Sequence, residues 1–159
     1  MKAKDIMNPV TVFLHPDDTL QQAVLKLRIE KNREDSGING MVVLDDQKKI
    51  VGVLSIKDIL RATIPVYLDL KIAQFSWDGM LEKMAQQVAC RKVKEFMSSD
   101  VVTVSQDTPL MVCTDLLIQK SLQRLPVVDE AARVVGIVRI DDIYTVISKI
   151  LINQPECRA

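Results

Sequence analysis

A serine and an aspartate spaced three residues apart are the strongest candidates for chemistry in this sequence. They are Ser55 and Asp58, in the stretch Gly-Val-Leu-Ser-Ile-Lys-Asp at 52–58, where an apolar run leads into a predicted helix start. A carboxylate at that position offers hydrogen-bond acceptors for the vicinal hydroxyls of a bound sugar. The same Ser-x-x-Asp spacing is typical of a capping box, which satisfies the free N–H groups at the start of any helix. The sequence leaves both roles open for the pair, and the two are compatible.

Two basic residues lie close to this pair, at Lys57 and Arg61. The free N–H groups and the positive end of a helix favour a nearby phosphate. We therefore expect Lys57 and Arg61 to add positive charge at a phosphate of the ligand.

Other reactive residue types lack the neighbours that catalysis or metal binding requires. His15 is the only histidine, and the three cysteines form no Cys-x-x-Cys pair. Adjacent aspartates on turns or helix starts point apart, and no activated nucleophile accompanies them. These pairs are Asp17-Asp18, Asp45-Asp46 and Asp141-Asp142. We expect no catalytic residues, no metal site and no enzymatic activity.

The composition fits one ordinary globular domain, or two small halves that share a core. The chain has 159 residues, of which 48% are hydrophobic and 4% aromatic. Lys plus Arg and Asp plus Glu balance at 21 each, so no long-range field attracts nucleic acid or an anionic membrane. Charges interrupt every apolar stretch well short of a membrane span, and the first ten residues lack a signal-peptide run. We expect a soluble, cytoplasmic protein that binds neither nucleic acid nor membranes.

An internal repeat sets the organisation of the chain. Lys-Ala-Lys-Asp-Ile-Met at 2–7 returns as Lys-Val-Lys-Glu-Phe-Met at 92–97, an offset of 90. The stretch 43–59 returns at 127–143, an offset of 84. The first copy therefore has six extra residues, which we place in the polar run 30–37. The predicted parts are a first unit at 1–62, a helical spacer at 63–92, a second unit at 93–154 and a tail at 155–159.

Each copy is predicted to fold as strand, helix, strand, strand, helix, an α/β (α+β) arrangement. The strands fall at 10–14, 41–44 and 50–54 in the first copy, and at 101–104, 125–128 and 134–138 in the second. Helical spacing marks as core Leu20, Ala23, Val24 and Leu27 in the first copy, and Leu110, Cys113 and Leu117 in the second.

Helix ends and spacer add three further expectations. We place N-caps at Asp18 and at Thr108, which precedes a proline. The closing helix of the second copy carries an apolar stripe from Ile143 to Leu151, more than a small unit covers alone. A stripe from Met80 to Val88 predicts that the spacer helix is packed, with docking of a partner as the alternative.

The second copy departs from the first at its candidate site. Its equivalent stretch, 136–142, has Arg139 in place of the serine, while Asp142 keeps the position of the aspartate. Arginine has no hydroxyl with which to cap a helix, and its bulk either fills the pocket or pairs with a phosphate. We expect one competent site and one degenerate or repurposed site.

The doubled pattern resembles a tandem pair of CBS (cystathionine β-synthase) domains, also called a Bateman module. The residues that carry it are Asp-Ile-Met followed by a β-branched strand, and Leu-Pro-Val-Val-Asp-Glu-Ala-Ala-Arg-Val-Val-Gly-Ile-Val followed by x-x-Asp-Ile. The resemblance covers roughly residues 1–62 and 93–152. It implies two β-α-β-β-α units packed about a pseudo-twofold axis, with clefts between them.

The resemblance also implies a function. Such modules bind adenosine-containing ligands, such as AMP, ADP, ATP or S-adenosylmethionine, and regulate an attached or associated protein. The family's ligand motif, Gly-apolar-apolar-(Ser/Thr)-x-x-Asp, matches 52–58 throughout. By this resemblance Asp58 accepts hydrogen bonds from the ribose and Ser55 adds a third contact. Residues near Val101, Val102, Arg124 and Leu125 hold the base.

We therefore expect a regulatory module that signals to an unidentified partner protein in trans, as a homodimer and with no required cofactor. The alternative, of a different class, is a structural or dimerisation module that takes no small-molecule ligand. Fold alone does not decide between them.

Overall fold

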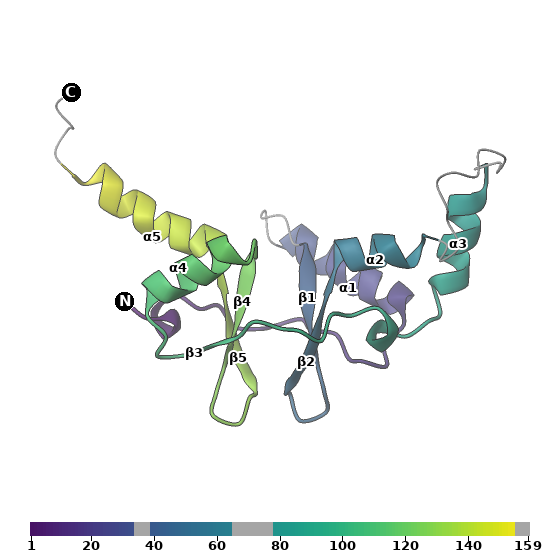
Figure 1. Ribbon diagram of the computed structural model, residues 1–159, viewed down its shortest axis with the longest axis horizontal. Helices are drawn as coiled ribbons and strands as arrows, with labels where there is room; N and C mark the ends of the chain where they lie inside the picture. Colours follow the sequence, from purple (N-terminus) through teal and green to yellow (C-terminus); the bar gives the residue numbers. More distant parts are fainter. Residues whose placement is uncertain (34–38, 65–77, 155–159) are drawn as a thin grey trace. The chain divides into compact units, whose positions relative to one another are not determined.

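The computed structural model describes residues 1–33, 39–64 and 78–154 and divides into two compact units (Figure 1). Unit 1 consists of Met1–Thr11 and Val102–Ala159, and unit 2 of Val12–Val101. The leading segment of each repeat thus belongs to the unit built around the other repeat. The predicted units at 1–62 and 93–154 describe the two copies of the sequence repeat, and their boundaries stay a prediction.

Unit 2 is built on a small antiparallel sheet. Strand β1, Gly40–Leu44, pairs with β2, Ile50–Ser55. Leu14 adds a parallel bridge to Val43 at one edge, and Ser98 adds an antiparallel bridge to Val53 at the other. The helices described in this unit are α1 (Leu20–Arg33), α2 (Ile56–Ala62), α3 (Met80–Val88) and the 3-10 turn η2 (Val93–Glu95).

Unit 1 repeats this topology. Here the leading segment of the first repeat, 1–11, packs on the strands of the second repeat, as 93–101 packs on those of the first in unit 2. Its strands are β3 (Val104–Ser105), β4 (Arg124–Val128) and β5 (Val134–Arg139). They form one sheet in the order β3-β4-β5, where β3 pairs parallel with β4, and β4 antiparallel with β5. Asn8 pairs with Ile137 of β5, as Ser98 does with Val53 of β2. The described helices of this unit are η1 (Ala3–Asp5), α4 (Leu110–Gln119) and α5 (Ile140–Ile152).

The hydrophobic core of each unit lies between its sheet and its helices. Most of the predicted core positions are confirmed as buried: Leu20, Ala23, Leu27, Leu110, Cys113 and Leu117. Val24 was predicted there wrongly, because its side chain is 37% exposed. It lies one residue beyond Ala23, about 100° further round the helix, which places it at the margin of the apolar stripe.

Three other expectations need correction. The strand predicted at 10–14 is reduced to the single bridge at Leu14, and the one at 101–104 to the two-residue β3. The chain passes from one unit to the other at 11–12 and at 101–102, so these stretches lack a continuous partner strand. The helix caps are also displaced: Thr19 caps α1 in exchange with Gln22, and α4 follows an N-cap at Pro109.

The spacer and tail are described only in part. The six-residue insertion placed at 30–37 falls partly outside the described residues, as do 65–77 of the spacer and the tail at 155–159. On α3 Val88 is buried, whereas Leu81 is exposed. The spacer helix thus packs through the end of its predicted stripe. None of the helices in the described ranges is long and apolar enough to cross a membrane.

Candidate functional site

Ser55 and Asp58 form a complete capping box at the junction of β2 and α2. The Asp58 N–H donates to Ser55 Oγ at 3.2 Å, and the Ser55 N–H donates to Asp58 Oδ2 at 2.8 Å. The Ser55 hydroxyl also donates to Asp58 Oδ2, at 2.7 Å. These contacts confirm the predicted cap and fix the carboxylate through one of its two oxygens.

The other oxygen of Asp58 faces a basic side chain. Arg61 donates to Asp58 Oδ1 at 2.9 Å, and its side chain is 69% exposed while that of Asp58 is 12% exposed. Lys57 is also exposed. The structure therefore brings Ser55, Asp58 and Arg61 together at the start of α2. Oδ1 of Asp58 faces the Arg61 guanidinium, which is exposed to solvent.

The glycine of the motif has a packing role in both units. A Cβ at Gly52 would lie 2.6 Å from Met97 Sδ and 2.9 Å from the Ser98 carbonyl oxygen. At Gly136 it would lie 2.8 Å from Met7 Sδ. The leading segment of one repeat thus crosses close to the other's strand, and at Gly52 an added Cβ would meet its backbone as well as its methionine.

In unit 1 the equivalent carboxylate is held by different side chains. Asp142 Oδ2 accepts a hydrogen bond from Asn8 Nδ2 at 2.7 Å and another from Arg139 Nε at 3.1 Å. Arg139 stands at the N-cap of α5 without a side-chain cap bond. The sequence prediction missed Asn8, which lies 134 residues from Asp142. The one signal for Asn8 in the sequence is the repeat offset of 90, which makes Asn8 equivalent to Ser98. Ser98 pairs with Val53, inside the motif at 52–58.

The predicted base-holding residues are divided between the units. Val101 belongs to unit 2 and Val102 to unit 1, where Val102 packs half-buried against the core. Arg124 is half-buried at the start of β4, and its backbone pairs with Arg139 of β5. Leu125 is fully buried in the unit 1 core. Unit 1 thus groups Arg124, Arg139 and Asp142, and unit 2 groups the Ser55 site.

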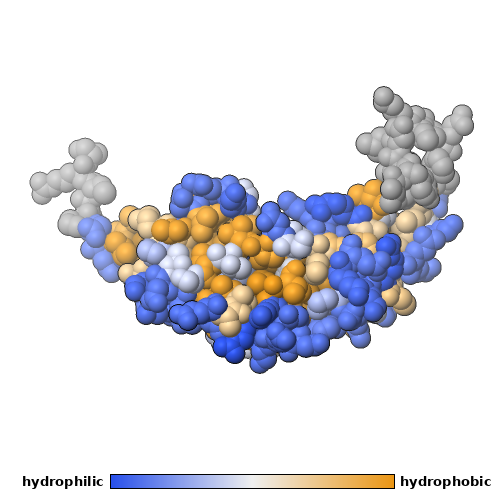
Figure 2. Space-filling view, turned by 60° about the horizontal axis from the view of Figure 1, so that its bottom comes forward, coloured by the Kyte–Doolittle hydropathy of each residue, from blue (hydrophilic) through white to orange (hydrophobic). Residues whose placement is uncertain are grey.

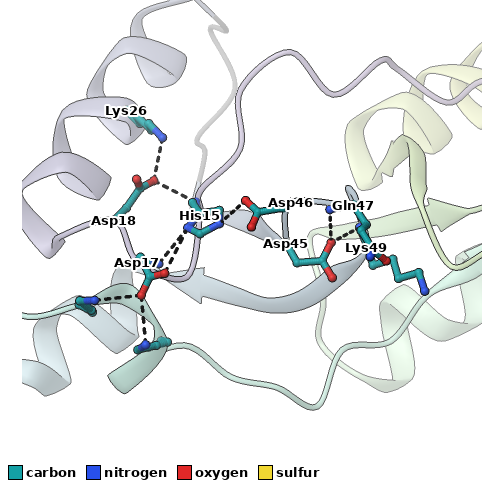
Figure 3. Close-up of polar contacts among 10 residues, drawn as sticks. His15, Asp17, Asp18, Lys26, Asp45, Asp46, Gln47 and Lys49 are labelled. Carbon is teal, nitrogen blue, oxygen red and sulfur yellow. Dashed lines mark hydrogen bonds and ion pairs between the residues drawn. The ribbon is translucent and has the colours of Figure 1, made fainter.

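A polar network around His15 is a second cluster that the sequence did not predict (Figure 3). The Asp17 N–H donates to His15 Nδ1 at 3.1 Å, so the neutral ring carries its hydrogen on Nε2, 2.9 Å from Asp46 Oδ1. Asp18 Oδ2 accepts from the His15 N–H and from Lys26 Nζ. These bonds join the loop before α1 to the β1–β2 turn. No group of three or more metal-ligating side chains occurs in the part of the chain that the structure describes.

Repeat-related aspartates anchor the two leading segments. Asp17 Oδ1 pairs with Lys92 and Lys94 at 3.0 Å each, and hydrogen bonds from these lysines lower the pKa of Asp17 to about 2. In unit 1 Lys4 and Lys2 pair with Asp107 at 2.8 and 3.0 Å. Their hydrogen bonds lower the pKa of Asp107 to about 2 as well. The Lys-x-Lys of the repeat therefore holds each segment to its unit.

Comparison with known proteins accounts for this doubled architecture. The family model described as CBS domain matches the chain twice, at residues 3–64 and 93–149. The chain belongs to the CBS domain family. The two matches confirm the tandem CBS pair that the repeat indicated, and the mixed α+β fold agrees with solved CBS-pair structures.

Three relatives show the range of proteins that this CBS pair resembles. Inosine-5'-monophosphate dehydrogenase of Methanocaldococcus jannaschii is 25% identical over 142 residues, which cover 89% of this chain and 23% of that enzyme. CBSX2 from Arabidopsis thaliana, solved in complex with AMP, is 24% identical with a TM-score of 0.68, covering 94% of this chain and 98% of that one. The cytosolic domain of the Mg²⁺ channel MgtE, solved with ATP, is 27% identical with a TM-score of 0.67, covering 91% and 48%.

The CBS pair thus spans about a quarter of the dehydrogenase and about half of the MgtE chain. In fold it resembles modules that were solved with adenine nucleotides bound.

Proposed function

We propose that this CBS pair is a regulatory module that binds an adenosine-containing ligand, AMP, ADP or ATP, through Ser55 and Asp58. The observation that carries the proposal is the geometry of Asp58, whose Oδ2 is fixed by the cap while, among the described residues, Oδ1 accepts from an exposed arginine alone. Nucleotides in the solved complexes of CBSX2 and MgtE support the class of ligand.

In this proposal the cap and the ligand use different oxygens of one carboxylate. Oδ2 stays with the Ser55 N–H and hydroxyl, which hold the side chain in one orientation. Oδ1 accepts hydrogen bonds from the ribose hydroxyls when Arg61 leaves it, and Ser55 contributes the third contact. The Arg61 side chain is 69% exposed, so it moves into water when the ligand takes its place on Oδ1.

The released Arg61 and the exposed Lys57 then neutralise phosphate oxygens of the ligand. The predicted roles of Val102, Arg124 and Asp142 in ligand binding stay predictions. The proposal assigns no catalytic step to any of these residues. Its output is a change in binding to a partner protein in trans, without a required cofactor.

We propose in addition that the CBS pair is a homodimer that associates through helix faces. On α5 only Ile143 is buried, whereas five apolar or aromatic side chains are at least 40% exposed: Tyr144, Ile147, Ile150, Leu151 and Ile152. Figure 2 shows hydrophobic residues at the surface where α5 approaches the C-terminal end. A second copy would cover this stripe, which exceeds what unit 1 covers. Sedimentation velocity of the parent and of an Ile147→Asp variant tests this, and a monomeric parent contradicts it.

Thermal unfolding with a nucleotide panel tests the ligand proposal. A ligand at 100 times its dissociation constant stabilises the native state by about 2.7 kcal/mol, which raises the midpoint by roughly 5–10 °C for a chain of this size. We expect that shift with at least one of AMP, ADP and ATP, and its loss in Asp58→Ala. Asp115→Ala, which removes an exposed carboxylate of α4, is the control. Indifference to all three nucleotides favours the structural module instead.

A further inference from the structure

His15 distinguishes the loop before the first helix of unit 2 from its counterpart in unit 1. The ring lies between two loops, with Nε2 2.9 Å from Asp46 Oδ1 and with Nδ1 accepting the Asp17 N–H at 3.1 Å (Figure 3). The repeat offset of 90 places Ser105 at the equivalent position of unit 1. There the Ser105 N–H donates to Thr108 Oγ1 at 3.0 Å, within one loop. The two loops therefore differ by a group that can take up a proton.

The loop around His15 holds the leading segment of the second repeat. The Val93 N–H donates to the Asp18 carbonyl at 2.8 Å. The Lys94 N–H donates to the Pro16 carbonyl at 3.0 Å. The segment then crosses β2, where its Ser98 pairs with the strand that leads into the candidate site. The loop 15–18 thus supports a segment that borders this site.

Unit 1 holds its own leading segment by the same backbone bonds without a histidine. The Ala3 N–H donates to the Thr108 carbonyl at 2.9 Å, and the Lys4 N–H donates to the Gln106 carbonyl at 3.0 Å. At the offset of 90, these four residues are the equivalents of Val93, Asp18, Lys94 and Pro16. Unit 1 therefore provides an internal control for any effect of His15.

Proton uptake by this cluster near neutral pH falls to the imidazole. Imidazole is the side-chain type that changes charge between pH 5 and 8. Asp17 stays ionised there, because hydrogen bonds from the two lysines of the leading segment lower its pKa to about 2. Burial opposes the ionised form of Asp18, but hydrogen bonds from the His15 N–H and from Lys26 outweigh it and lower the pKa of Asp18. The charged groups that face the ring, directly or through these bonds, are Asp17, Asp18, Asp46, Lys26, Lys92 and Lys94.

A proton on the ring removes the acceptor at Nδ1. The imidazolium donates from both nitrogens, so Nδ1 no longer accepts the Asp17 N–H, and two donors then face each other at 3.1 Å. The Asp17 carboxylate lies on this side of the ring, with Oδ2 3.9 Å from Nδ1. Its Oδ1 holds Lys92 and Lys94 at 3.0 Å each. A third positive charge therefore competes with the two lysines for one carboxylate.

We propose that protonation of His15 loosens the hold of the loop 15–18 on the leading segment 93–101, and that unit 1 keeps its hold under the same conditions. Nδ1 takes the proton from solvent and exchanges the backbone N–H of Asp17 for the carboxylate of the same residue. Nε2 keeps its hydrogen bond to Asp46. Unit 2 is thereby the pH-sensitive half of the CBS pair, independently of any ligand.

Amide hydrogen exchange at pH 8 and pH 5, followed by NMR and expressed as protection factors, tests the proposal. We expect the factors of Val93 and Lys94 to fall at least threefold at pH 5, and those of Ala3 and Lys4 to stay within twofold. In His15→Asn the factors of Val93 and Lys94 should stay within twofold as well. The asparagine side chain can still accept the Asp17 N–H, two residues on, but takes up no proton.

The ring itself gives an independent reading, because His15 is the only histidine in the sequence. In a ¹⁵N spectrum of the ring nitrogens we expect hydrogen on Nε2 alone at pH 8 and on both nitrogens at pH 5. A neutral ring with its hydrogen on Nδ1, or a ring still neutral at pH 5, overturns the proposal. Unchanged protection of Val93 and Lys94 beside a protonated ring overturns it too, as does an equal fall at Ala3 and Lys4 or in His15→Asn. Should His15→Asn not fold, the comparison of the two units in the parent decides.

Discussion

Replacement of Gly52 by alanine probes the close crossing that joins the leading segment to the Ser55 strand. The added Cβ would lie 2.6 Å from Met97 Sδ, 3.0 Å from Met97 Cγ and 2.9 Å from the Ser98 carbonyl oxygen. The methionine can turn aside, but the Ser98 carbonyl accepts the Val53 N–H at 2.9 Å, and the Ser98 N–H donates back at 2.9 Å. Relief of the clash therefore stretches two backbone hydrogen bonds.

Overpacking of this kind costs about 1–3 kcal/mol. For a chain of 159 residues, each kcal/mol lowers the midpoint of thermal unfolding by roughly 2–4 °C. We expect Gly52→Ala to lower it by roughly 2–12 °C without ligand, followed by circular dichroism. The share of this loss that comes from the Met97 contact is measured by comparing the Gly52→Ala/Met97→Ala double variant with Met97→Ala. There the alanine at 52 should lower the midpoint by less than it does in the parent.

The sign of the effect makes the test decisive. At an unstrained position, glycine to alanine stabilises a protein by about 0.4–1 kcal/mol, because the unfolded chain loses freedom. A Gly52→Ala variant with an unchanged or raised midpoint would refute the close crossing of Met97 and Ser98 over β2.

Three further predictions concern the supports of the two units. The pKa of Asp17 and of Asp107 is lowered from 3.8 to about 2, so the stability that these carboxylates add is complete above about pH 4 and is lost as the pH falls through 2. In urea unfolding at pH 5, 4 and 3, the free energy of unfolding should therefore fall less steeply in Asp17→Asn/Asp107→Asn than in the parent. Equal slopes would contradict the lysine anchors. Ala132 has a φ of 60°, so Ala132→Gly should raise stability by about 0.5–1 kcal/mol in urea unfolding while Ala131→Gly does not, and equal effects contradict the left-handed turn. Ser55→Ala should cost about 0.5–2 kcal/mol and Ser55→Thr much less, and equal midpoints for the two would contradict the cap.

The sequence predicted the repeat, the class of fold and the cap at Ser55 because these depend on local signals. Apolar spacing placed Leu20 and Leu117 in the cores, and Ser-x-x-Asp spacing placed the helix start of α2. Patterns of this kind act over a few residues, and tertiary contacts did not override them.

The exchange of leading segments was beyond such reasoning. Both copies carry Lys-x-Lys and an aspartate before the first helix, so the lysines at 92 and 94 fit Asp17 and Asp107 equally well on paper. The structure pairs them with Asp17 of the other repeat. Because the two choices use identical chemistry, nothing local in the sequence separates them.

The contact between Asn8 and Asp142 was missed for a related reason. It is a side-chain contact across 134 residues, made only because the leading segment crosses β5. Without the exchange, Asn8 would read as a turn residue before a proline.

Equilibrium dialysis of radiolabelled ATP and AMP against the parent, Asp58→Ala and the Asp115→Ala control tests the central claim most directly. The account predicts saturable binding of at least one nucleotide by the parent and the control, and a loss of at least tenfold in affinity in a folded Asp58→Ala variant. Binding that is equally tight in Asp58→Ala would contradict the claim that this carboxylate holds the ligand.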